Sequence, residues 1–297
     1  MSERLAEVGR RIATVRQLDV VVNAMRGIAG ARALQSRARL PAIRAYAATV
    51  AQAIAETQRL QEMDATASAA SRTTRPGLVV FGAEQGFAGA FPEQILDTAT
   101  KDFAAAQVFM LGSRSVALAQ ERGIALRWTH AAPSGVGALG ETASAIVDAL
   151  YAYLEEVGSV PVTMLYPMSR PGRPVEIIRR SLLPLDQRSF MSAGARPPPL
   201  LNLPPYQLIA RLAQEYLFAL LCEATAEALA AENEARAATM AAAKTHIDGK
   251  LGELEAEERL TRQEEITAEV IELAAGVRLR RLFRLISGPI QKSSSLS

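Results

Sequence analysis

Apolar residues recur at helical spacing through the C-terminal part of the chain. Steps of four and three residues give Leu208, Leu212, Glu215, Ala219, Cys222, Ala226, Leu229, Asn233, Arg236, Met240, Ala243 and Ile247. Proline is absent between Pro205 and Pro289, so the pattern predicts one very long helix. About eighty helical residues reach roughly 120 Å, far more than the radius of gyration of about 19 Å of a compact globule of this length. We expect this helix to project and to need a partner for its apolar stripe.

The start of the chain supplies a candidate partner helix. Its apolar positions follow the same spacing, at Leu5, Val8, Ile12, Val15, Leu18, Val22, Met25 and Ala29, without proline before Pro41. Residues 1–44 carry nine arginines and three acidic residues, whereas residues 253–272 carry eight glutamates and two arginines. These opposite charges favour an antiparallel coiled coil of the two chain ends.

In the middle of the chain, strand-like and helical segments alternate, which is typical of a small α/β domain. Strand-like runs are expected at 77–81, 107–111, 124–129, 160–166 and, as a closing strand, 175–182. Helical stretches between them are expected at 92–105, 113–122 and 139–157. The predicted fold class is therefore α/β, a long antiparallel two-helix coiled coil formed by the chain termini plus a small Rossmann-like α/β domain. The predicted domains are 1–70 for the first shaft helix, 71–205 for the α/β domain, and 206–297 for the second shaft helix and a short tail.

Composition limits the classes of function. Charged residues make up 22% of the 297 residues and the net charge is only +2, which does not call for a nucleic-acid partner. No apolar run approaches the roughly eighteen residues of a membrane span, and Met1 leads directly into the helical pattern, so we expect an intracellular chain. The single cysteine, Cys222, lies on the apolar seam and is interpreted as a core residue.

The residues of this chain do not match the spacing of known catalytic or cofactor-binding motifs. The turn Gly82 to Gly89 reads G-x-x-x-G-x-x-G, which is not the dinucleotide fingerprint, and no acid follows the second predicted strand. We interpret it as a tight strand-to-helix turn, with a nucleotide site as the alternative. His130 and His246 lack partners at ligand spacing, and Gly249-Lys250 lacks the flanking residues of a phosphate loop. We therefore expect no catalytic residue, cofactor or metal in this chain.

Particular residues then carry a family resemblance. Residues 266–277, ITAEVIELAAGV, resemble the signature I-T-x-E-x-x-E-x-x-x-G-A of the gamma subunits of F-type ATP synthases, from which only Val277 departs. Residues 232–240 resemble the E-x-x-A-R-x-x-x-M stretch of that family, and Arg11-Ile12 through Ala24-Met25 resemble its R-I…A-M opening. Residues 86–89, GFAG, stand where the family has G-L-C-G after its first strand.

The resemblance implies a central rotor stalk with no catalytic residues of its own. In that family the coiled coil enters a ring of three alpha and three beta subunits around one gamma, while the α/β domain binds epsilon and the membrane c-ring. Rotation driven by ion flow is thereby coupled to ATP synthesis or hydrolysis. The implied location is peripheral, on the cytoplasmic face of the bacterial inner membrane, with no nucleic acid and no direct small-molecule substrate.

The same resemblance assigns candidate partner-binding residues. Arg262 and Gln263 match a polar R-Q pair that the family aims at a loop of the beta subunit, and Met25 is the matching position on the first helix. The signature stretches add Arg236, Met240, Thr267 and Glu269. Without the resemblance, Arg262 would be read as a solvated helix charge.

Alternatives from other classes remain. A coiled-coil scaffold or adaptor without motor role would explain the helices but not the signature, and a nucleotide-dependent α/β enzyme would need a ligand at Gly82 to Gly89. The residues before Ala24-Met25 and the extension from Leu279 depart from the family pattern and are compatible with an alternative F-type branch. That extension is basic and amphipathic over 279–286, so a membrane-surface helix is a second reading beside a shaft tip.

Overall fold

The computed structural model describes residues 3–61, 75–170, 175–185, 190 and 200–286. These residues form two compact units. The terminal unit comprises Met1–Asn23 and Ala242–Ser297, and the body unit comprises Ala24–Ala241. Two long helices contribute to both units, α1 at Glu3–Gln61 and α5 at Pro205–Ile286.

The single long C-terminal helix is confirmed, since α5 runs for 82 residues. Pro205 stands at its first residue, where the missing N–H would have no intrahelical partner. The shaft is not free of proline, however, because α1 continues through Pro41. Leu40, the residue before it, is buried against Leu139, Ala226 and Leu229, and this packing offsets the hydrogen bond that proline removes.

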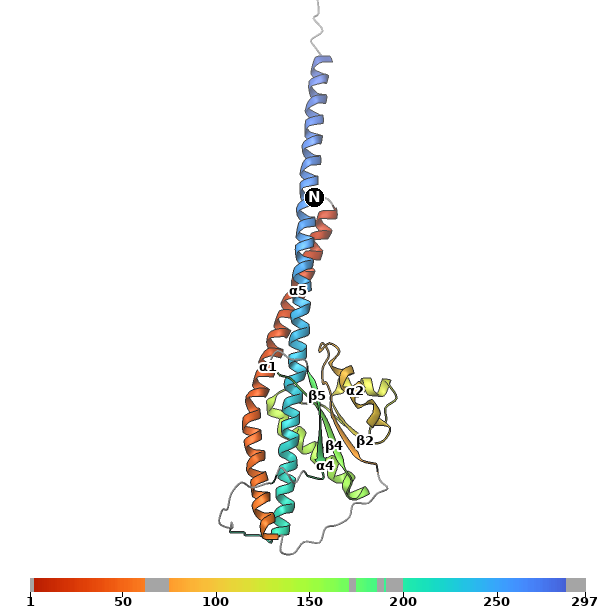
Figure 1. The fold of residues 1–297 in the computed structure, drawn as a ribbon. Coiled ribbons are helices and arrows are strands. Elements are labelled where there is room, and N and C mark those ends of the chain that lie inside the picture. The colour runs from red at the N-terminus through yellow and green to blue at the C-terminus, as the bar shows by residue number, and fades with distance from the viewer. Residues whose placement is uncertain (1–2, 62–74, 171–174, 186–189, 191–199, 287–297) are drawn as a thin grey trace, which may run out of the picture. The chain divides into compact units, whose positions relative to one another are not determined.

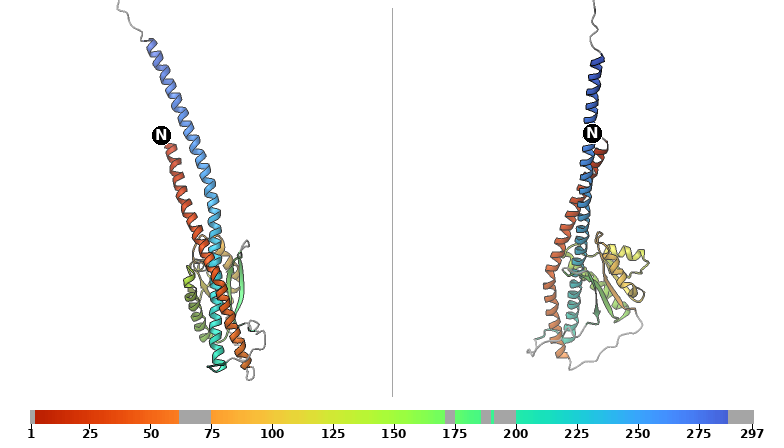
Figure 2. Two further views of the ribbon diagram at one scale, coloured as in Figure 1. Left: turned by 90° about the vertical axis from the view of Figure 1, so that its left-hand side faces the viewer. Right: turned by 45° about the horizontal axis from the view of Figure 1, so that its top comes forward.

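In the body unit, α1 and α5 run side by side next to the sheet (Figure 1, Figure 2). Small residues allow a close approach, since Ala29, Ala33 and Ser36 are all fully buried on α1. The Ser36 hydroxyl donates to the backbone carbonyl of Ala226 on α5 at 2.7 Å. The short Ser36 side chain reaches this carbonyl because both helices carry small residues at the contact, Ser36 on α1 and Ala226 on α5.

The α/β part of the body unit has a five-stranded sheet in the order β3-β2-β1-β4-β5. The strands are β1 at Gly77–Phe81, β2 at Gln107–Leu111, β3 at Trp128–His130, β4 at Val162–Met168 and β5 at Glu176–Leu183. The first four are parallel, and β5 pairs antiparallel with β4. The helices between them are α2 at Phe91–Phe103, α3 at Ser113–Glu121 and α4 at Leu139–Val157, with a short 3-10 turn at Val136–Ala138. This is the predicted Rossmann-like arrangement.

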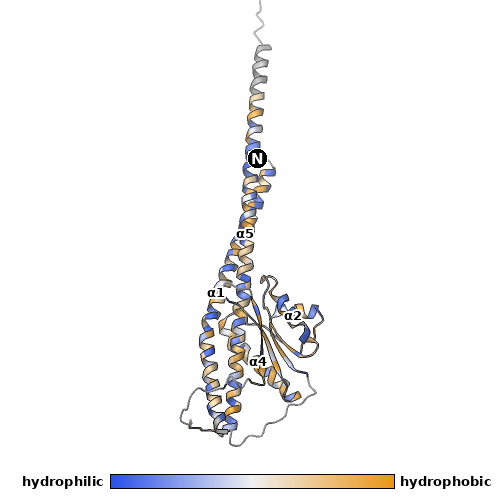
Figure 3. Ribbon diagram, in the orientation of Figure 1, coloured by the Kyte–Doolittle hydropathy of each residue, from blue (hydrophilic) through white to orange (hydrophobic). Residues whose placement is uncertain are grey.

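Side-chain alternation along the strands builds two cores, one on each face of the sheet. Val79 and Phe81 of β1 pack with α4 and with the buried sides of α1 and α5. Leu78 and Val80 pack instead with α2 and α3. Figure 3 shows the resulting hydrophobic colouring of the strands and of the adjacent stretch of α5. Both faces of the parallel strands are covered, which explains their continuous apolar sequences.

Three predicted strand boundaries were wrong by a few residues. The third strand begins at Trp128 rather than Ile124, because Gly123 (φ +69°) leaves α3 in a turn and Ile124 donates back to Ala119 at 3.0 Å. The fourth begins at Val162, after Pro161, whose carbonyl accepts from Gly77 but which has no N–H to offer. The closing strand is shifted by one residue, to Glu176–Leu183.

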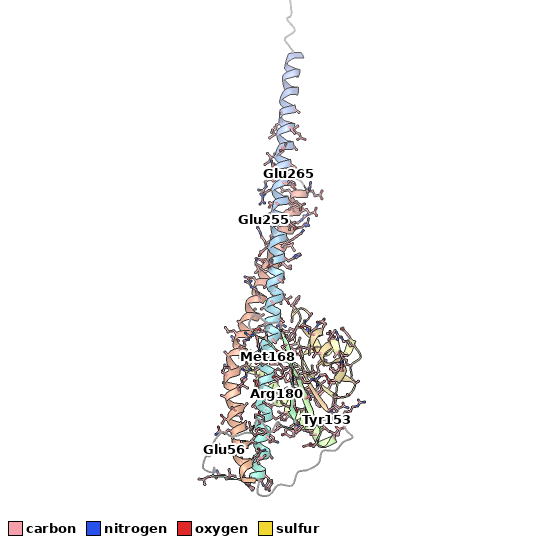
Figure 4. All side chains as sticks on the ribbon, viewed as in Figure 1. Glu56, Tyr153, Met168, Arg180, Glu255 and Glu265 are labelled. Atoms are coloured by element: carbon pink, nitrogen blue, oxygen red, sulfur yellow. The ribbon has the colours of Figure 1, made fainter. Side chains whose placement is uncertain are left out.

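The terminal unit contains the antiparallel pairing that the charges predicted. Val8 and Ile12 of α1 form an apolar cluster with Leu254 of α5. Arg16 lies 2.9 Å from Glu255, the glutamate labelled on α5 in Figure 4, and Arg4 lies 3.7 Å from Glu264. These two ion pairs join the basic N-terminal helix to the acidic stretch 253–272, as expected.

The other arginines of the basic N-terminal stretch use different acids. Within the body unit, Arg37 pairs with Glu234, and Arg44 pairs with Glu227 and Glu223. Both sets of pairs follow the same antiparallel alignment of α1 with α5. The charge balance of 1–44 against 253–272 therefore predicted the correct orientation, although Arg37 and Arg44 of that basic stretch pair with acidic residues outside 253–272.

The prediction that Leu18 lies on the apolar seam was also wrong. Leu18 is 56% exposed, and the half-buried position beside it is Asp19, whose Oδ1 lies 2.9 Å from Lys244 Nζ on α5. A polar pair therefore stands in the apolar seam.

Candidate partner-binding surfaces

The seven candidate residues divide between the two units. Met25, Arg236 and Met240 belong to the body unit, and the other four, Arg262, Gln263, Thr267 and Glu269, belong to the terminal unit. Exposure separates them in the same way, because the terminal-unit residues are exposed whereas Arg236 and Met240 are buried.

The terminal-unit candidates lie on an open stretch of α5. From Arg262 to Ala275 every side chain is exposed except the half-buried Glu265, labelled in Figure 4. Arg262 Nη2 lies 2.8 Å from Glu258 Oε1, four residues earlier on the same helix. An exposed pair of this kind contributes little to stability, so Arg262 can exchange it for a carboxylate on another protein at small cost. Thr267 donates its hydroxyl to the carbonyl of Gln263 at 2.8 Å.

Apolar side chains on the same stretch were missed as candidates. Ile266, Val270 and Leu273 follow one another at steps of four and three, and each is more than half exposed. Their spacing places them on one face of the helix. Together they form a candidate interaction surface. All three residues lie within the signature at 266–277. Their apolar spacing could therefore have been recognised from the sequence.

The same unit exposes apolar residues on α1. Leu18, Val20 and Val21 are 56–69% exposed. Leu18 was predicted to lie on the inner seam, and Val21 belongs to the stretch before Ala24-Met25 that departs from the family pattern. The exposed apolar residues of the terminal unit therefore come from both helices.

Two of the body-unit candidates are buried and the third is half-buried. Met25 is half-buried on α1 and Met240 is 4% exposed on α5. The Arg236 side chain is 7% exposed, and its Nη2 lies 2.6 Å from Glu232 Oε1 one turn earlier on α5. Its guanidinium already binds groups of this chain, so contact of Arg236 with another subunit stays a prediction.

The glycine-rich turn after β1 is packed and hydrogen-bonded internally. A Cβ on Gly82 would lie 2.5 Å from the Ser115 hydroxyl, and one on Gly112 would lie 2.5 Å from the carbonyl oxygen of Ala83. These glycines let the exits of β1 and β2 touch. The interpretation as a tight strand-to-helix turn is therefore supported by contacts.

Carboxylates occupy the amide donors that a phosphate would use at this edge of the sheet. Glu84 accepts from the backbone N–H of Ser113 at the start of α3 at 3.0 Å and from that of Ala132 at 2.7 Å. Glu232 accepts from the backbone N–H groups of Glu84 and Gln85. The geometry that binds anions in related folds is thus satisfied by the chain's own side chains.

Burial shifts the pKa values of groups that lie outside the candidate positions, among them Cys222 and Glu227. Burial raises the pKa of the Cys222 thiol to about 11, and the thiol lies in the main core, as the sequence predicted. Burial also raises the pKa of the Glu227 carboxyl, although the positive charge of Arg44 acts in the opposite direction. Both shifts follow from desolvation of the charged form.

Histidines, metals and membrane spans add no further site among the residues described. His130 stacks on Trp128 with ring centroids 5.4 Å apart. Over the described ranges, no group of three or more His, Cys, Asp or Glu side chains is placed to hold a metal ion. Over the same ranges, no helix combines the length and the apolar character needed to cross a bilayer.

Comparison with known proteins gives one family. The sequence model of the family described as ATP synthase matches residues 4–278. The ATP synthase gamma chain of Synechococcus sp. (strain JA-3-3Ab) is 24% identical over 307 residues, which cover 92% of this chain and 98% of the relative. That of Geotalea daltonii is 21% identical over 281 residues, covering 92% and 97%.

Solved structures agree in fold. A chain of the Euglena gracilis mitochondrial ATP synthase (OSCP/F1/c-ring) superposes with a TM-score of 0.61 at 12% identity, covering 99% of both chains. A chain of the Tetrahymena thermophila mitochondrial ATP synthase (central stalk/c-ring) gives a TM-score of 0.56 at 16% identity, covering 75% of this chain and 99% of that one. The coiled coil with an inserted α/β domain is thus the fold of these chains. Since the family match spans residues 4–278 and the relatives are gamma chains over almost their whole length, this chain belongs to the ATP synthase family, where its counterpart is the gamma chain.

Proposed function

We propose that this chain is the central rotor stalk, or gamma subunit, of an ion-translocating F-type ATP synthase. The observation that carries the proposal is the near full-length similarity to ATP synthase gamma chains. The chain contributes no catalytic residues and works as a non-catalytic subunit. Its partners are three alpha and three beta subunits around one copy of itself, together with epsilon and the membrane c-ring.

The two units suit different parts of this role. The terminal unit presents Arg262, Gln263, Thr267 and Glu269 on open helix surface beside exposed apolar residues, and we assign it to contacts with the alpha and beta subunits. Met25, Arg236 and Met240 are assigned to contacts with the same subunits, although these three residues are less exposed. The α/β domain, residues 71–205, is assigned to epsilon and the c-ring. The complex is placed on the cytoplasmic face of the bacterial inner membrane, as a peripheral assembly.

Asymmetry of the shaft is what couples rotation to chemistry. A partner that binds all states of a site equally shifts none of them. A shaft present once inside a threefold ring presents a different face to each catalytic site, and so gives each site a different bias. Two helices of different sequence and different exposed residues, as in the terminal unit, provide such unequal faces.

Stoichiometry tests the proposal directly. Most soluble oligomers repeat one contact in every subunit, but this shaft must be present once per ring. Native mass measurement of the soluble complex reconstituted with its alpha and beta subunits should show three alpha, three beta and one copy of this chain. Three copies per ring, or a stable complex without alpha and beta, would support a coiled-coil scaffold instead.

A further inference from the structure

The loop that follows β1 is bound by two side chains one turn apart on α5. The backbone N–H groups of Glu84 and Gln85 donate to the two carboxylate oxygens of Glu232, each at 3.0 Å. Arg236 donates from Nε to the carbonyl of Gly86 at 3.1 Å and from Nη2 to that of Gln85 at 3.2 Å. Four hydrogen bonds therefore join α5 to three consecutive residues of the loop.

The side chains of Glu232 and Arg236 are also held in place by contacts within α5. Their exposed fractions are 5% for Glu232 and 7% for Arg236, and the two form an ion pair at 2.6 Å. Arg236 Nη1 also donates to Asn233 Oδ1 at 3.1 Å, and Asn233 donates to the carbonyl of Leu229. Charge-assisted bonds in a buried, fully satisfied network are among the strongest and most directional contacts in a protein.

The side chain of Glu84 links the loop to the segments that follow β2 and β3. Its carboxylate accepts from the N–H and hydroxyl of Ser113, at 3.0 and 2.8 Å, and from the N–H of Ala132 at 2.7 Å. A continuous chain of bonds thus runs from α5 through the loop to the start of α3 and the segment after β3. We call Glu232, Arg236 and the backbone of residues 84–86 the clamp.

We propose that Glu232 and Arg236 are positioning residues that fix the α/β part of the body unit to α5 against sliding and rotation. Apolar contacts between helix and sheet are not directional, whereas bonds to named backbone groups fix both the height and the rotational setting of the helix. In a stalk, torque received by the α/β domain then passes to the shaft without slip. This consequence for torque rests on the proposed function, whereas the clamp itself does not.

Hydrogen exchange of the purified full chain tests the clamp. Glu232→Gln keeps the shape of the side chain but leaves only one of its two oxygens as an acceptor. We expect the amides of residues 84 and 85 to exchange about tenfold faster or more. Glu234→Gln, two residues away and paired with Arg37 on α1, is the matched control. Equal protection of both amides in the two variants would overturn the clamp.

Arg236→Lys provides a second variant should Glu232→Gln fold poorly. Lysine keeps the positive charge beside Glu232 but cannot donate to two carbonyls, to Glu232 and to Asn233 at once. Faster exchange confined to the loop in this variant supports the clamp, and unchanged exchange overturns it.

The torque role is tested in the complete complex in liposomes. Ions pumped per ATP hydrolysed should fall by about half or more in Glu232→Gln, while ATP hydrolysis continues and Glu234→Gln keeps the normal ratio. A purely structural defect would lower assembly and both activities together. Faster exchange with an unchanged pumping ratio would overturn the torque role. Failure of the unmodified chain to enter the complex would overturn the proposed function instead, and the exchange result would still decide the clamp.

Discussion

Arg44 on α1 and Glu227 on α5 form an ion pair in which Arg44 Nη2 lies 2.6 Å from Glu227 Oε1. The Glu227 side chain is 5% exposed, whereas that of Arg44 is 51% exposed. Arg44 also binds Glu223, which in turn binds Arg180 on β5, labelled in Figure 4. One arginine at the surface therefore neutralises a buried carboxylate and joins α1 to α5 and, through Glu223, to the sheet.

Replacing this arginine should leave a buried charge without its partner. We expect Arg44→Met to lower the free energy of unfolding by about 2 kcal/mol at neutral pH, measured by urea denaturation. Met keeps part of the side-chain packing, so the loss reports the charge. Arg39→Met, at an exposed position on the same helix, is the control and should change stability by only a few tenths of a kcal/mol.

The effect of Arg44→Met should depend on pH with a defined sign. The pKa of Glu227 is raised above 4.5 in the folded chain by burial, so the folded state binds the proton more tightly than the unfolded state. The free energy of unfolding then carries a component that falls as pH rises from 4.5 through the folded pKa. Without Arg44 that pKa rises further, and the difference from the wild type should shrink toward pH 4.5. A difference that stays constant with pH, or grows in acid, would contradict this account.

Much of this organisation could be predicted from sequence, because its causes are local or periodic. The absence of proline after Pro205 predicted the length of α5, and the runs at 77–81 and 107–111 predicted β1 and β2 at their exact residues. Opposite charges predicted that α1 and α5 run antiparallel. Each of these signals acts over neighbouring residues or over a whole segment.

The details that failed depend on contacts between distant residues. The inward position is Asp19 and not Leu18, and Asp19 pairs there with Lys244, which lies far along the chain. The bond of Arg236 to the carbonyl of Gly86 could not be predicted, because the loop lies 150 residues earlier in the chain; contact of Arg236 with another subunit stays a prediction. The exposed stripe from Ile266 becomes visible only when the structure shows that nothing described on α1 covers it.

Gly112 should tolerate substitution less well than Gly123, although both have positive φ. Alanine at Gly123 (φ +69°) meets no atom within 4 Å, so its cost is the strain of the left-handed conformation, about 1 kcal/mol. Alanine at Gly112 (φ +97°) adds a contact of 2.5 Å with the backbone carbonyl of Ala83. We expect about 2 kcal/mol of further destabilisation there, measured by urea denaturation. Equal losses would show that the exits of β1 and β2 separate easily.

Cys222 should be unreactive in the native chain. Its thiol is buried and its pKa of about 11 leaves very little thiolate at pH 8. An aromatic disulfide reagent at pH 8 should modify the native protein at least about a hundredfold more slowly than the protein in guanidinium. In guanidinium one thiol per chain should react, since the sequence has a single cysteine. Rapid modification of the native chain would contradict the burial of α5 at this position.

The polar pair in the terminal-unit seam should show coupling between its members. Lys244 also pairs with Asp248, one turn later on α5. Lys244→Leu leaves Asp19 facing an apolar side chain, and Asp19→Leu leaves Lys244 with Asp248 as its acidic neighbour, so each should lower the midpoint of thermal unfolding, Lys244→Leu by more. The double replacement removes both charges and extends the apolar seam of Val8, Ile12 and Leu254. Its midpoint should therefore equal or exceed that of the wild type. If the two single losses simply add in the double variant, Asp19 and Lys244 do not act as a pair.

Arg262 and Gln263 should matter in the assembled complex and not in the isolated chain. Both are exposed, and the ion pair of Arg262 with Glu258 is a surface pair, so replacing both by alanine should leave the unfolding transition of the isolated chain unchanged. If these residues contact the beta subunit in only some states of the catalytic site, their loss removes a difference between states. A difference of about 1 kcal/mol corresponds to a roughly fivefold effect. ATP turnover of the complex should then fall about fivefold with normal assembly.

Arg259→Ala provides the control for this double variant, because it removes an exposed arginine one turn earlier on the same helix. It should change neither assembly nor turnover. Equal turnover in the wild type and the Arg262→Ala/Gln263→Ala complex would mean that Arg262 is an ordinary solvated charge. Equal losses in the double variant and in Arg259→Ala would instead mean that the acidic stretch of α5 responds to its net charge. Only a loss confined to the double variant supports a specific contact, because the same helix, exposure and charge are then compared at two neighbouring positions.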